Sequence, residues 1–329
     1  MIIVGDIHLD KRFPFTNKKT ANRWRALQDA TLERVVSLTK DDEQWIQVGD
    51  LFDNFMVTAE QFIRAQILVS KHCVALLAGN HDRSNDTDKV SAVNLLTKAV
   101  SEVSEITEDA HHYVLVPHQL TQDAFNAALV DAESRIRLGR INVLLLHCNF
   151  SDREGVITEN YLSSARLKEL ESKFAFIIGG HEHNGRSTGP RSLLIGSLLP
   201  MNFGEMGPKY VMGIDTTDTN MHLIWDDKEH YRKWSYEEFL EQPITNDLQF
   251  IEVNGAASVT DTLLVAKKVA AWYNTSESII AIKPDLTRVE TTSTAEDAPN
   301  ARQVSWVDFL TNQMTEDERV LFEELMNAA

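Results

Sequence analysis

Three features of the sequence predict an α/β fold in which two packed sheets are flanked by helices. Short apolar runs that favour strands recur along the first half of the chain, and amphipathic helical patterns lie between most of them. Such alternation is typical of layered α/β domains. After residue 178 the pattern becomes strand-rich, which predicts the second half of a two-sheet β-sandwich. A small α+β capping domain and a C-terminal helical hairpin are expected to follow.

The elements of the first domain, residues 1–226, follow from the spacing of apolar residues. Continuous apolar runs predict buried strands at residues 2–4, 45–48, 74–77, 143–146 and 174–178. Apolar residues at helical spacing predict helices at residues 24–38 and 59–70. Three further strands are expected at residues 193–195, 210–214 and 221–225.

The rest of the chain divides into three parts. The capping domain, residues 227–285, is predicted from a strand at 250–253, a helix at 262–273 and a strand at 279–282. Residues 286–303 are mostly polar and predict a linker. Residues 304–329 contain capping-box patterns that begin at Ser305 and Thr315, which predicts a helical hairpin. So short a hairpin must pack either on the catalytic domain or on a partner, and the polar linker favours the partner.

Composition excludes several classes of protein. The chain has 329 residues, a net charge of −17 and only two cysteines, Cys73 and Cys148. Two cysteines make neither a disulfide framework nor a zinc-finger spacing, so a reducing, cytoplasmic setting is expected. No secretory leader and no apolar run of membrane-spanning length is recognised. The acidic charge argues against a protein that binds nucleic acid by itself.

Five polar clusters directly follow five of the predicted strands. They are Gly5-Asp6-Ile7-His8, Gly49-Asp50-Leu51-Phe52-Asp53, Gly79-Asn80-His81-Asp82, Leu146-His147-Cys148 and Gly180-His181-Glu182-His183. Ligands of open α/β sheets bind beyond the carboxyl ends of the strands, so the clusters are expected to meet at one edge. Carboxylate, imidazole and amide donors without thiolates suit Mn²⁺, Fe or Zn²⁺. Seven donors suit two ions about 3.5–4 Å apart that share a bridging carboxylate.

This ordered set resembles the signature of the calcineurin-like metallophosphoesterases over residues 5–183. The resemblance implies the metallophosphoesterase fold and two divalent ions, with Mn²⁺ expected. It places around one ion Asp6, His8, Asp50 and His183, and around the other Asp50, Asn80, His147 and His181. It makes His81 the catalytic histidine over the leaving group, oriented by Asp53. Arg83, Arg153 and Arg186 flank the clusters and could contact substrate phosphates.

The stretch from Ile195 to Glu205 is similar to a Gly-Ser-Pro…Phe-Gly-Glu stretch of SbcD-type DNA exonuclease subunits, including their phage counterparts. It departs from them at Leu198, where those proteins usually have proline. The resemblance implies 3′→5′ exonuclease and single-strand endonuclease activity in DNA recombination, repair or replication. It also implies that residues 304–329 bind an SbcC-type, SMC-like ATPase. A homodimer of this chain within a heterotetramer is expected, in the cytoplasm of a bacterial or phage-infected cell.

Two other functions stay open. A stand-alone phosphodiesterase or pyrophosphohydrolase for a small molecule would use the same site but would need no hairpin at residues 304–329. A catalytically silent scaffold would use the fold only for binding, and the complete set of donors argues against it.

Overall fold

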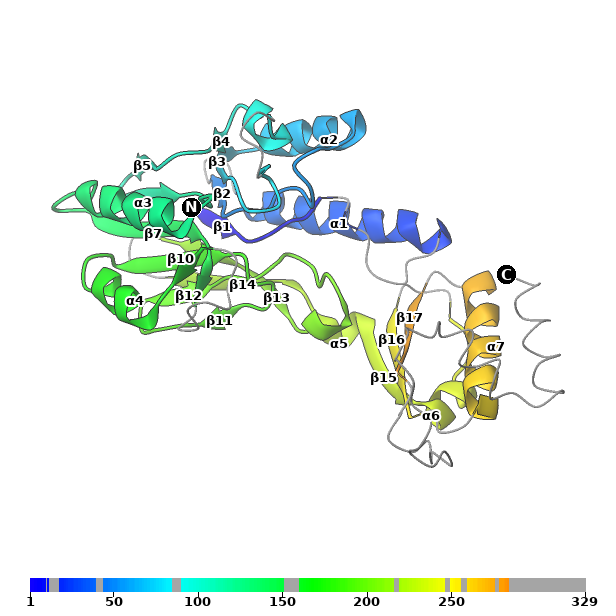
Figure 1. Ribbon diagram of the computed structural model, residues 1–329. Helices are drawn as coiled ribbons and strands as arrows, with labels where there is room; N and C mark the ends of the chain where they lie inside the picture. Colours follow the sequence, from blue (N-terminus) through cyan, green and yellow to red (C-terminus); the bar gives the residue numbers. More distant parts are fainter. Residues whose placement is uncertain are drawn as a thin grey trace, which may run out of the picture. The chain divides into compact units, whose positions relative to one another are not determined.

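The computed structural model describes residues 1–9, 11, 18–39, 44–84, 90–150, 160–215, 219–245, 249–255, 259–275 and 278–283 (Figure 1). These residues form two compact units, and the first contains residues 24–227 together with the N-terminal residues 1–9 and 11, whereas residues 18–23 group with the second. The predicted linker at 286–303 and the predicted hairpin at 304–329 lie outside the described residues. Among the described helices, none combines the length and apolarity needed to cross a membrane.

The first sheet of the first unit has six strands in the order β14-β13-β1-β2-β3-β4. Their bounds are β1 (Ile2–Val4), β2 (Trp45–Gln47), β3 (Cys73–Leu77), β4 (Ala99–Val100), β13 (Lys209–Ile214) and β14 (Thr219–Trp225). Strands β1 to β4 are parallel, whereas β13 is antiparallel to β1. Helices α1 (Lys18–Leu38) and α2 (Ala59–Val69) cover this sheet, because Leu32, Val35 and Leu68 are buried in one cluster with its side chains.

The second sheet also has six strands, in the order β11-β12-β10-β7-β6-β5. Their bounds are β5 (Ser104–Glu108), β6 (His111–Val116), β7 (Ile141–His147), β10 (Phe176–Gly180), β11 (Arg186–Ser187) and β12 (Ser192–Leu194). The central strands β6, β7, β10 and β12 are parallel. Helices α3 (Gln122–Ser134) and α4 (Ser164–Glu171) pack on it through Phe125, Leu129 and Leu170.

Apolar side chains from both sheets fill the space between them. Ile3 and Ile46 of the first sheet share one buried cluster with Leu145 and Ile178 of the second. The layers are therefore helix, sheet, sheet and helix, and the predicted two-sheet sandwich flanked by helices is confirmed. The parallel central strands have both faces covered, which explains why they read as continuous apolar runs in the sequence.

Several elements of this unit did not show in the sequence pattern. Strand β6 begins with His111 and His112, and both are buried although they interrupt the apolar run. Helix α3 buries two alanines, Ala128 and Ala132, so its apolar stripe is weak. The unit also contains β8 (Asn149–Phe150), β9 (Tyr161–Leu162) and the 3₁₀ helices η1 (Ala92–Leu95) and η2 (Phe203–Glu205).

The second unit contains a sheet of three strands, β15 (Tyr231–Ser235), β16 (Phe250–Asn254) and β17 (Ile279–Lys283). Helix α6 (Tyr236–Glu241) connects the first two strands and α7 (Val259–Thr275) the last two, after the short α5 (Asp227–His230). All three strands are parallel, so the unit is α/β and not α+β as the sequence suggested. Parallel neighbours need such helical crossovers. Phe239, Ile251 and Trp272 form its buried core.

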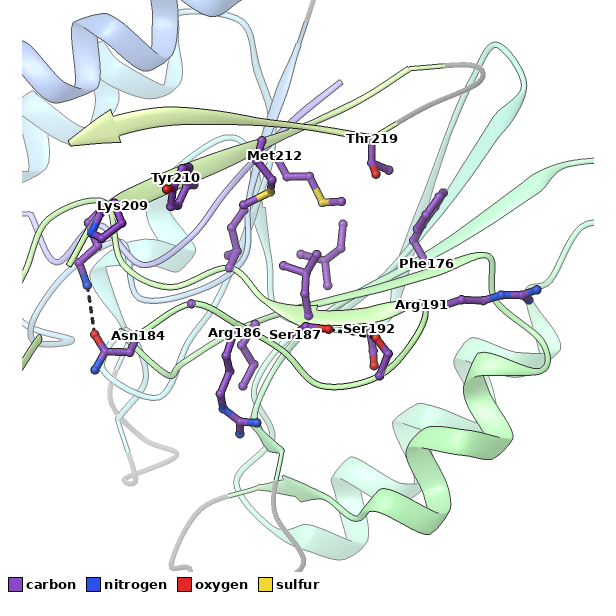
Figure 2. A pocket seen from close by; sticks show the side chains of 18 of the residues that line it. Phe176, Asn184, Arg186, Ser187, Arg191, Ser192, Lys209, Tyr210, Met212 and Thr219 are labelled. Carbon is purple, nitrogen blue, oxygen red and sulfur yellow. Dashed lines mark hydrogen bonds between the residues drawn. The ribbon is translucent and has the colours of Figure 1, made fainter. Parts of the chain in front are cut away.

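A cavity of about 510 Å³ opens in the first unit where β10, β11 and β12 face β13 and β14 (Figure 2). Phe176, Leu193 and Met212 give it apolar walls. Figure 2 shows Lys209 and Asn184 on one side of the cavity and Arg191 on the other. The Lys209 ammonium lies 3.5 Å from Asn184 Oδ1 and 2.8 Å from the carbonyl oxygen of His183. Lys209 thus connects this cavity to the loop that carries His183.

Candidate metal centre

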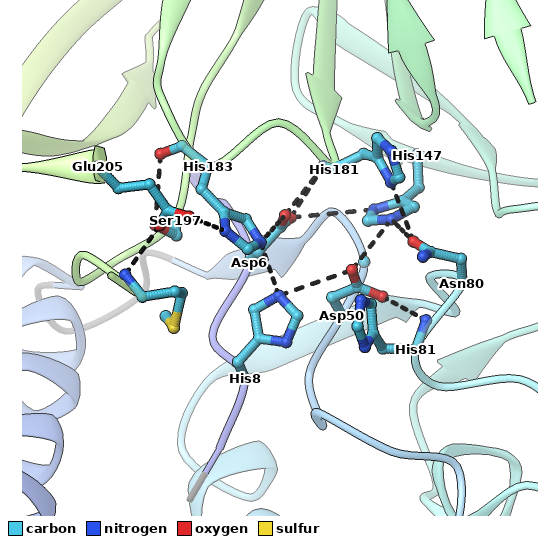
Figure 3. Close-up of polar contacts among 12 residues, drawn as sticks. Asp6, His8, Asp50, Asn80, His81, His147, His181, His183, Ser197 and Glu205 are labelled. Carbon is cyan, nitrogen blue, oxygen red and sulfur yellow. Dashed lines mark hydrogen bonds and ion pairs between the residues drawn. The ribbon is translucent and has the colours of Figure 1, made fainter. Parts of the chain in front are cut away.

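The carboxyl ends of five parallel strands bring the predicted site residues to one region of the first unit (Figure 3). Asp6 and His8 follow β1, Asp50 and Asp53 follow β2, and Asn80 and His81 follow β3. His147 ends β7, and His181 and His183 follow β10. Four of these side chains are fully or almost fully buried, namely Asp6, His8, Asp50 and His147. The donors therefore meet at the edge of the sheets, in a place shielded from water.

One set of donors is formed by Asp6, His8, Asp50 and His183. His8 Nε2 lies 2.9 Å from His183 Nε2 and 3.7 Å from Asp50 Oδ2. His183 Nε2 lies 3.8 Å from Asp6 Oδ2. The four residues come from three different strand ends, so only the folded chain assembles them. Asp6, His8 and His183 each place one donor atom within 4.8 Å of the other two, so a single cation could contact all three.

A second set of donors shares Asp50 with the first. His147 Nε2 lies 3.4 Å from Asp50 Oδ2 and 2.9 Å from Asn80 Oδ1. The same amide oxygen lies 3.0 Å from His181 Nδ1. The oxygen Oδ2 of Asp50 therefore lies next to both sets, the place that a bridging carboxylate would take.

The separations within each set fit a divalent cation. Neighbouring ligands at about 2.1 Å from an ion in octahedral geometry lie about 3 Å apart. The observed donor-to-donor distances run from 2.9 to 3.8 Å. Imidazole, carboxylate and amide donors are also the types that first-row divalent metals accept. The residues present therefore fit divalent cations.

Electrostatics favour a cation at the same place. Burial, together with the neighbouring Asp50 carboxylate, raises the pKa of Asp6 well above its usual range. Burial also raises the pKa of Asp50, but His147 and His8 outweigh it and the net pKa lies below the ordinary value. Two carboxyl groups this close and this buried cannot both ionise at low cost without added positive charge. A divalent cation would supply that charge.

The backbone is strained at three of the expected ligands. His8 (φ 45°), Asp50 (φ 54°) and His181 (φ 90°) all have positive φ, although none is glycine. Each such residue costs about 1–3 kcal/mol and persists only when its surroundings hold it. Here the amides of Ile7 and His8 both donate to the carbonyl oxygen of Asp50, each at 3.0 Å. The loops after β1 and β2 thus fix each other and aim their side chains at the centre.

Glycines next to the ligands allow close approach rather than simply a turn. A Cβ on Gly79 would lie 2.1 Å from Asp50 Oδ1, and a Cβ on Gly49 would lie 1.9 Å from His147 Nδ1. Gly49 also has a positive φ of 110°, which favours glycine, whereas Gly79 does not have a positive φ. A sharp turn is therefore only part of what these glycines provide. Any larger residue would push a donor out of place.

Asp82 supports the centre and was not singled out from the sequence. Its buried carboxylate accepts hydrogen bonds from the amides of Leu51 (3.1 Å), Phe52 (2.8 Å) and Gly79 (3.0 Å). It thereby joins the loops that follow β2 and β3. Burial, and then the charge of Asp50, raise the pKa of Asp82 to about 7. Asp82 could have been recognised from the sequence, because it is the last residue of the Gly-Asn-His-Asp cluster.

His81 lies beside the donors and is about two-fifths exposed, with 38% of its side chain accessible. Its amide donates to Asp50 Oδ1 at 2.9 Å, and its Nδ1 lies 3.1 Å from the backbone carbonyl oxygen of Asp53. The Asp53 carboxylate is farther from His81 Nδ1, at 3.8 Å, than from His8 Nδ1, at 3.2 Å, and Lys11 Nζ, at 2.8 Å. The carboxylate of Asp53 therefore contacts His8 more closely than the His81 ring it was expected to orient.

Other residues near the site have contacts that the sequence did not reveal. Arg186 donates to both carboxylate oxygens of Glu182, and Arg83 donates to the carbonyl oxygen of Ser101, whereas Arg153 lies outside the described residues. Both arginines are thus held by the protein itself. His118 is buried with its ring centroid 6.3 Å from that of His147. Burial and the neighbouring His147 lower the pKa of His118 to about 3, so it is neutral at pH 7.

The family model for calcineurin-like phosphoesterases matches residues 1–185, which is more than half of the chain and includes every cluster described above. The chain belongs to the calcineurin-like phosphoesterase family. Calcineurin-like phosphoesterases are metal-dependent hydrolases of phosphoesters, so the converging donors have the chemistry that the family requires. No curated protein matches the chain.

Proposed function

We propose that the chain is a two-metal DNA nuclease subunit of the SbcD type, with Mn²⁺ as its preferred ion. The observation that carries the proposal is the position of Asp50 Oδ2, which lies 3.7 Å from His8 Nε2 and 3.4 Å from His147 Nε2. A carboxylate between two donor sets can bridge two ions. Asp6, His8 and His183 would complete one ion's sphere, and Asn80, His147 and His181 the other's. Paired ions of this kind suit in-line displacement at phosphorus.

The bound ions and the side chains of the protein would contribute different steps of the hydrolysis. When bound, the ions activate a water molecule as nucleophile and neutralise charge on the phosphoryl oxygens. His81 would assist the leaving oxygen, because its Nδ1 faces a carbonyl oxygen and must carry a hydrogen there. Its Nε2 is then the nitrogen left for the leaving oxygen, and it would donate a proton there from the imidazolium form, in which both ring nitrogens carry hydrogens. General acid assistance of this type contributes about 10²–10⁴-fold.

Support for the SbcD-type subclass comes from the stretch that resembles it. The amide of Leu198 donates to the carbonyl oxygen of Asp6 at 2.9 Å, and that of Ser197 donates to the carbonyl oxygen of His183 at 3.1 Å. The stretch therefore lies against the candidate metal centre, where a subclass-specific element would affect substrate or metal. The net charge of −17 favours a subunit that relies on a partner to hold DNA.

The test of substrate class compares DNA with small phosphodiesters. The metal-free chain is loaded with Mn²⁺ and assayed on duplex DNA labelled at the 3′ or 5′ end, single-stranded circles, bis(p-nitrophenyl) phosphate and a cyclic nucleotide. We expect release of nucleotides from 3′ ends and nicking of single-stranded circles. Asp50→Asn serves as the control for contaminating nucleases. Turnover of the cyclic nucleotide without any cleavage of DNA would favour the stand-alone small-molecule enzyme instead.

The proposed partner is an SbcC-type, SMC-like ATPase bound through residues 304–329, with two copies of this chain in the assembly. This segment lies outside the described residues, and its composition supports the proposal. Residues 286–329 contain nine acidic and three basic residues, and the segment from Val304 adds many apolar ones, including Trp306 and Phe309. A basic surface around an apolar groove would complement it. Aromatic residues at the centre of an interface often contribute about 2 kcal/mol or more.

Truncation after residue 303 tests the partner separately from the chemistry. We expect it to abolish co-purification with the ATPase while hydrolysis of bis(p-nitrophenyl) phosphate persists. Trp306→Ala should weaken association by about 30-fold or more, since 1.4 kcal/mol is a factor of ten. Loss of diester hydrolysis with unchanged partner binding would mean that the segment belongs to the catalytic unit.

A further inference from the structure

The carboxylate of Glu205 lies behind one of the expected metal ligands. Its Oε1 is 3.0 Å from His183 Nδ1, on the side of the ring opposite to the donor set (Figure 3). The other carboxylate oxygen accepts a hydrogen bond from the amide of Met201 at 2.8 Å. Only 14% of the Glu205 side chain is exposed. The carboxylate is thus held in one orientation and faces His183.

A short 3₁₀ turn fixes Glu205 in this place. The side chain of Asn202 caps η2 by accepting from the amide of Gly204 at 2.7 Å, and the amide of Glu205 donates to the carbonyl oxygen of Asn202 at 3.1 Å. The Asn202 amide group also donates to Glu205 Oε1. Phe203, inside the turn, is buried and anchors it to the first unit. The carboxylate therefore has little freedom to leave the imidazole.

The backbone of His183 is fixed from the same part of the sequence. Its carbonyl oxygen accepts from the amide of Ser197 at 3.1 Å, from Ser197 Oγ at 3.3 Å and from Lys209 Nζ at 2.8 Å. Because Ser197 and Lys209 hold the carbonyl oxygen of His183 and Glu205 holds its Nδ1, the imidazole ring is fixed in one orientation. In that orientation Nε2 lies 2.9 Å from His8 Nε2.

The tautomer follows from these contacts. A carboxylate can only accept, so His183 Nδ1 must carry the hydrogen, and in the neutral ring Nε2 then presents its lone pair. Metal-binding histidines commonly donate their second nitrogen to a carboxylate in this way, and losing that partner typically weakens metal binding about 10–100-fold. By contrast, His147 Nδ1 contacts a neutral acceptor, the carbonyl oxygen of Val48, at 2.9 Å.

We propose that Glu205 is a positioning residue which holds His183 in the Nδ1–H tautomer and so sets the affinity of the ion bound by Asp6, His8 and His183. This inference rests on the proposed metal centre. It adds a residue that lies beyond the family match, since that match ends at Gly185. The stretch from Ser197 to Lys209 then completes a centre whose expected ligands all lie earlier in the sequence.

The test measures metal affinity and tautomer in the full chain. Wild-type, Glu205→Ala and Glu205→Gln proteins are stripped with a chelator, checked by circular dichroism and titrated with Mn²⁺ by calorimetry. We expect Glu205→Ala to lose about 10–100-fold in affinity at one of two sites and to leave the other unchanged. Glu205→Gln keeps one oxygen acceptor, so its Mn²⁺ affinity should lie between those of wild type and Glu205→Ala. Glu169→Ala removes a charge from the exposed surface of α4 and should bind like wild type.

Long-range ¹H–¹⁵N correlation spectra of the metal-free proteins report the tautomer directly, with the His183 ring assigned from a His183→Gln variant. We expect a locked Nδ1–H form in wild type and its loss in Glu205→Ala. If Glu205→Ala does not fold, Glu205→Gln alone carries the affinity measurement. Wild-type affinity in the folded Glu205 variants would overturn the proposal. A wild-type chain that binds no Mn²⁺ would instead overturn the proposed metal centre, so the two failures are distinct.

Discussion

His8 and His183 bring their Nε2 atoms within 2.9 Å of each other although 175 residues separate them in sequence. The opposite nitrogen of each ring faces a carboxylate, Asp53 at 3.2 Å for His8 and Glu205 at 3.0 Å for His183. Two imidazoles that approach so closely gain nothing from each other unless a proton or a cation lies between them. The carboxylates behind them can hold both rings in one orientation. The two Nε2 atoms are therefore placed so that both could bind the same cation.

Replacement of Asp50 should remove the link between the two donor sets. Asp50→Asn keeps the size of the side chain but removes the charge that either ion would share. We expect most bound metal to be lost and hydrolysis of model diesters to fall by at least about a thousandfold, the loss of about 4 kcal/mol of transition-state stabilisation. Metal content by mass spectrometry and turnover of bis(p-nitrophenyl) phosphate measure this. Near-normal turnover would exclude a bridging role for Asp50.

His81→Ala should separate chemistry from metal binding. The ring lies beside the donors, and its Nδ1 hydrogen bond goes to the Asp53 carbonyl oxygen, not to a ligand. We expect metal content to stay at the wild-type level and turnover to fall about 10²–10⁴-fold on substrates with poor leaving groups. With p-nitrophenolate as leaving group, which needs little protonation, the loss should be much smaller. Equal losses on both substrates would contradict a leaving-group role.

Two glycine variants test the close packing behind Asp50. Gly79→Ala would place a methyl group 2.1 Å from Asp50 Oδ1, whereas a Cβ on Gly207 would meet no atom within 4 Å. We expect Gly79→Ala to weaken Mn²⁺ binding and to lower the midpoint of thermal unfolding. Gly207→Ala should behave like wild type in both measurements. If the two variants are indistinguishable, a methyl group at residue 79 fits without displacing Asp50, and the predicted clash is wrong.

The two thiols should be unreactive in the folded protein. Burial raises the pKa of Cys73 to about 12 and that of Cys148 well above its usual range. At pH 8 both are therefore protonated in the native state, and a thiol-specific reagent such as dithionitrobenzoate should react only after unfolding in urea. Because the folded pKa of Cys73 is raised, its contribution to stability is present below the unfolded pKa of about 8.5 and is lost as the pH rises towards 12. Rapid reaction of one thiol without denaturant would contradict this burial.

Much of the fold and of the candidate site could be predicted from local sequence. The five buried strands are continuous apolar runs, and a polar cluster follows each one, so the place of Asp6, Asp50, Asn80, His147 and His181 at the carboxyl ends of strands could be predicted. That these strands are divided between two sheets could not. The parallel sheet of β15, β16 and β17 was not predicted, because β15 was not recognised as a strand and only one helix and two strands were expected there. Strand β6 was missed because its buried histidines look like surface residues in the sequence.

By itself, the sequence determined which residue types are available as metal donors and the order in which strands deliver them, since both depend on local patterns of apolar and polar residues. Only the tertiary structure decided what lies behind those donors. Glu205 reaches His183 across 22 residues, Asp82 reaches the amides of Leu51 and Phe52 across about 30, and the Asp53 carboxylate contacts His8 more closely than His81. Such contacts depend on how separate loops pack after the chain has folded. The sequence around an Asp or Glu residue does not show whether its carboxylate faces water or an imidazole.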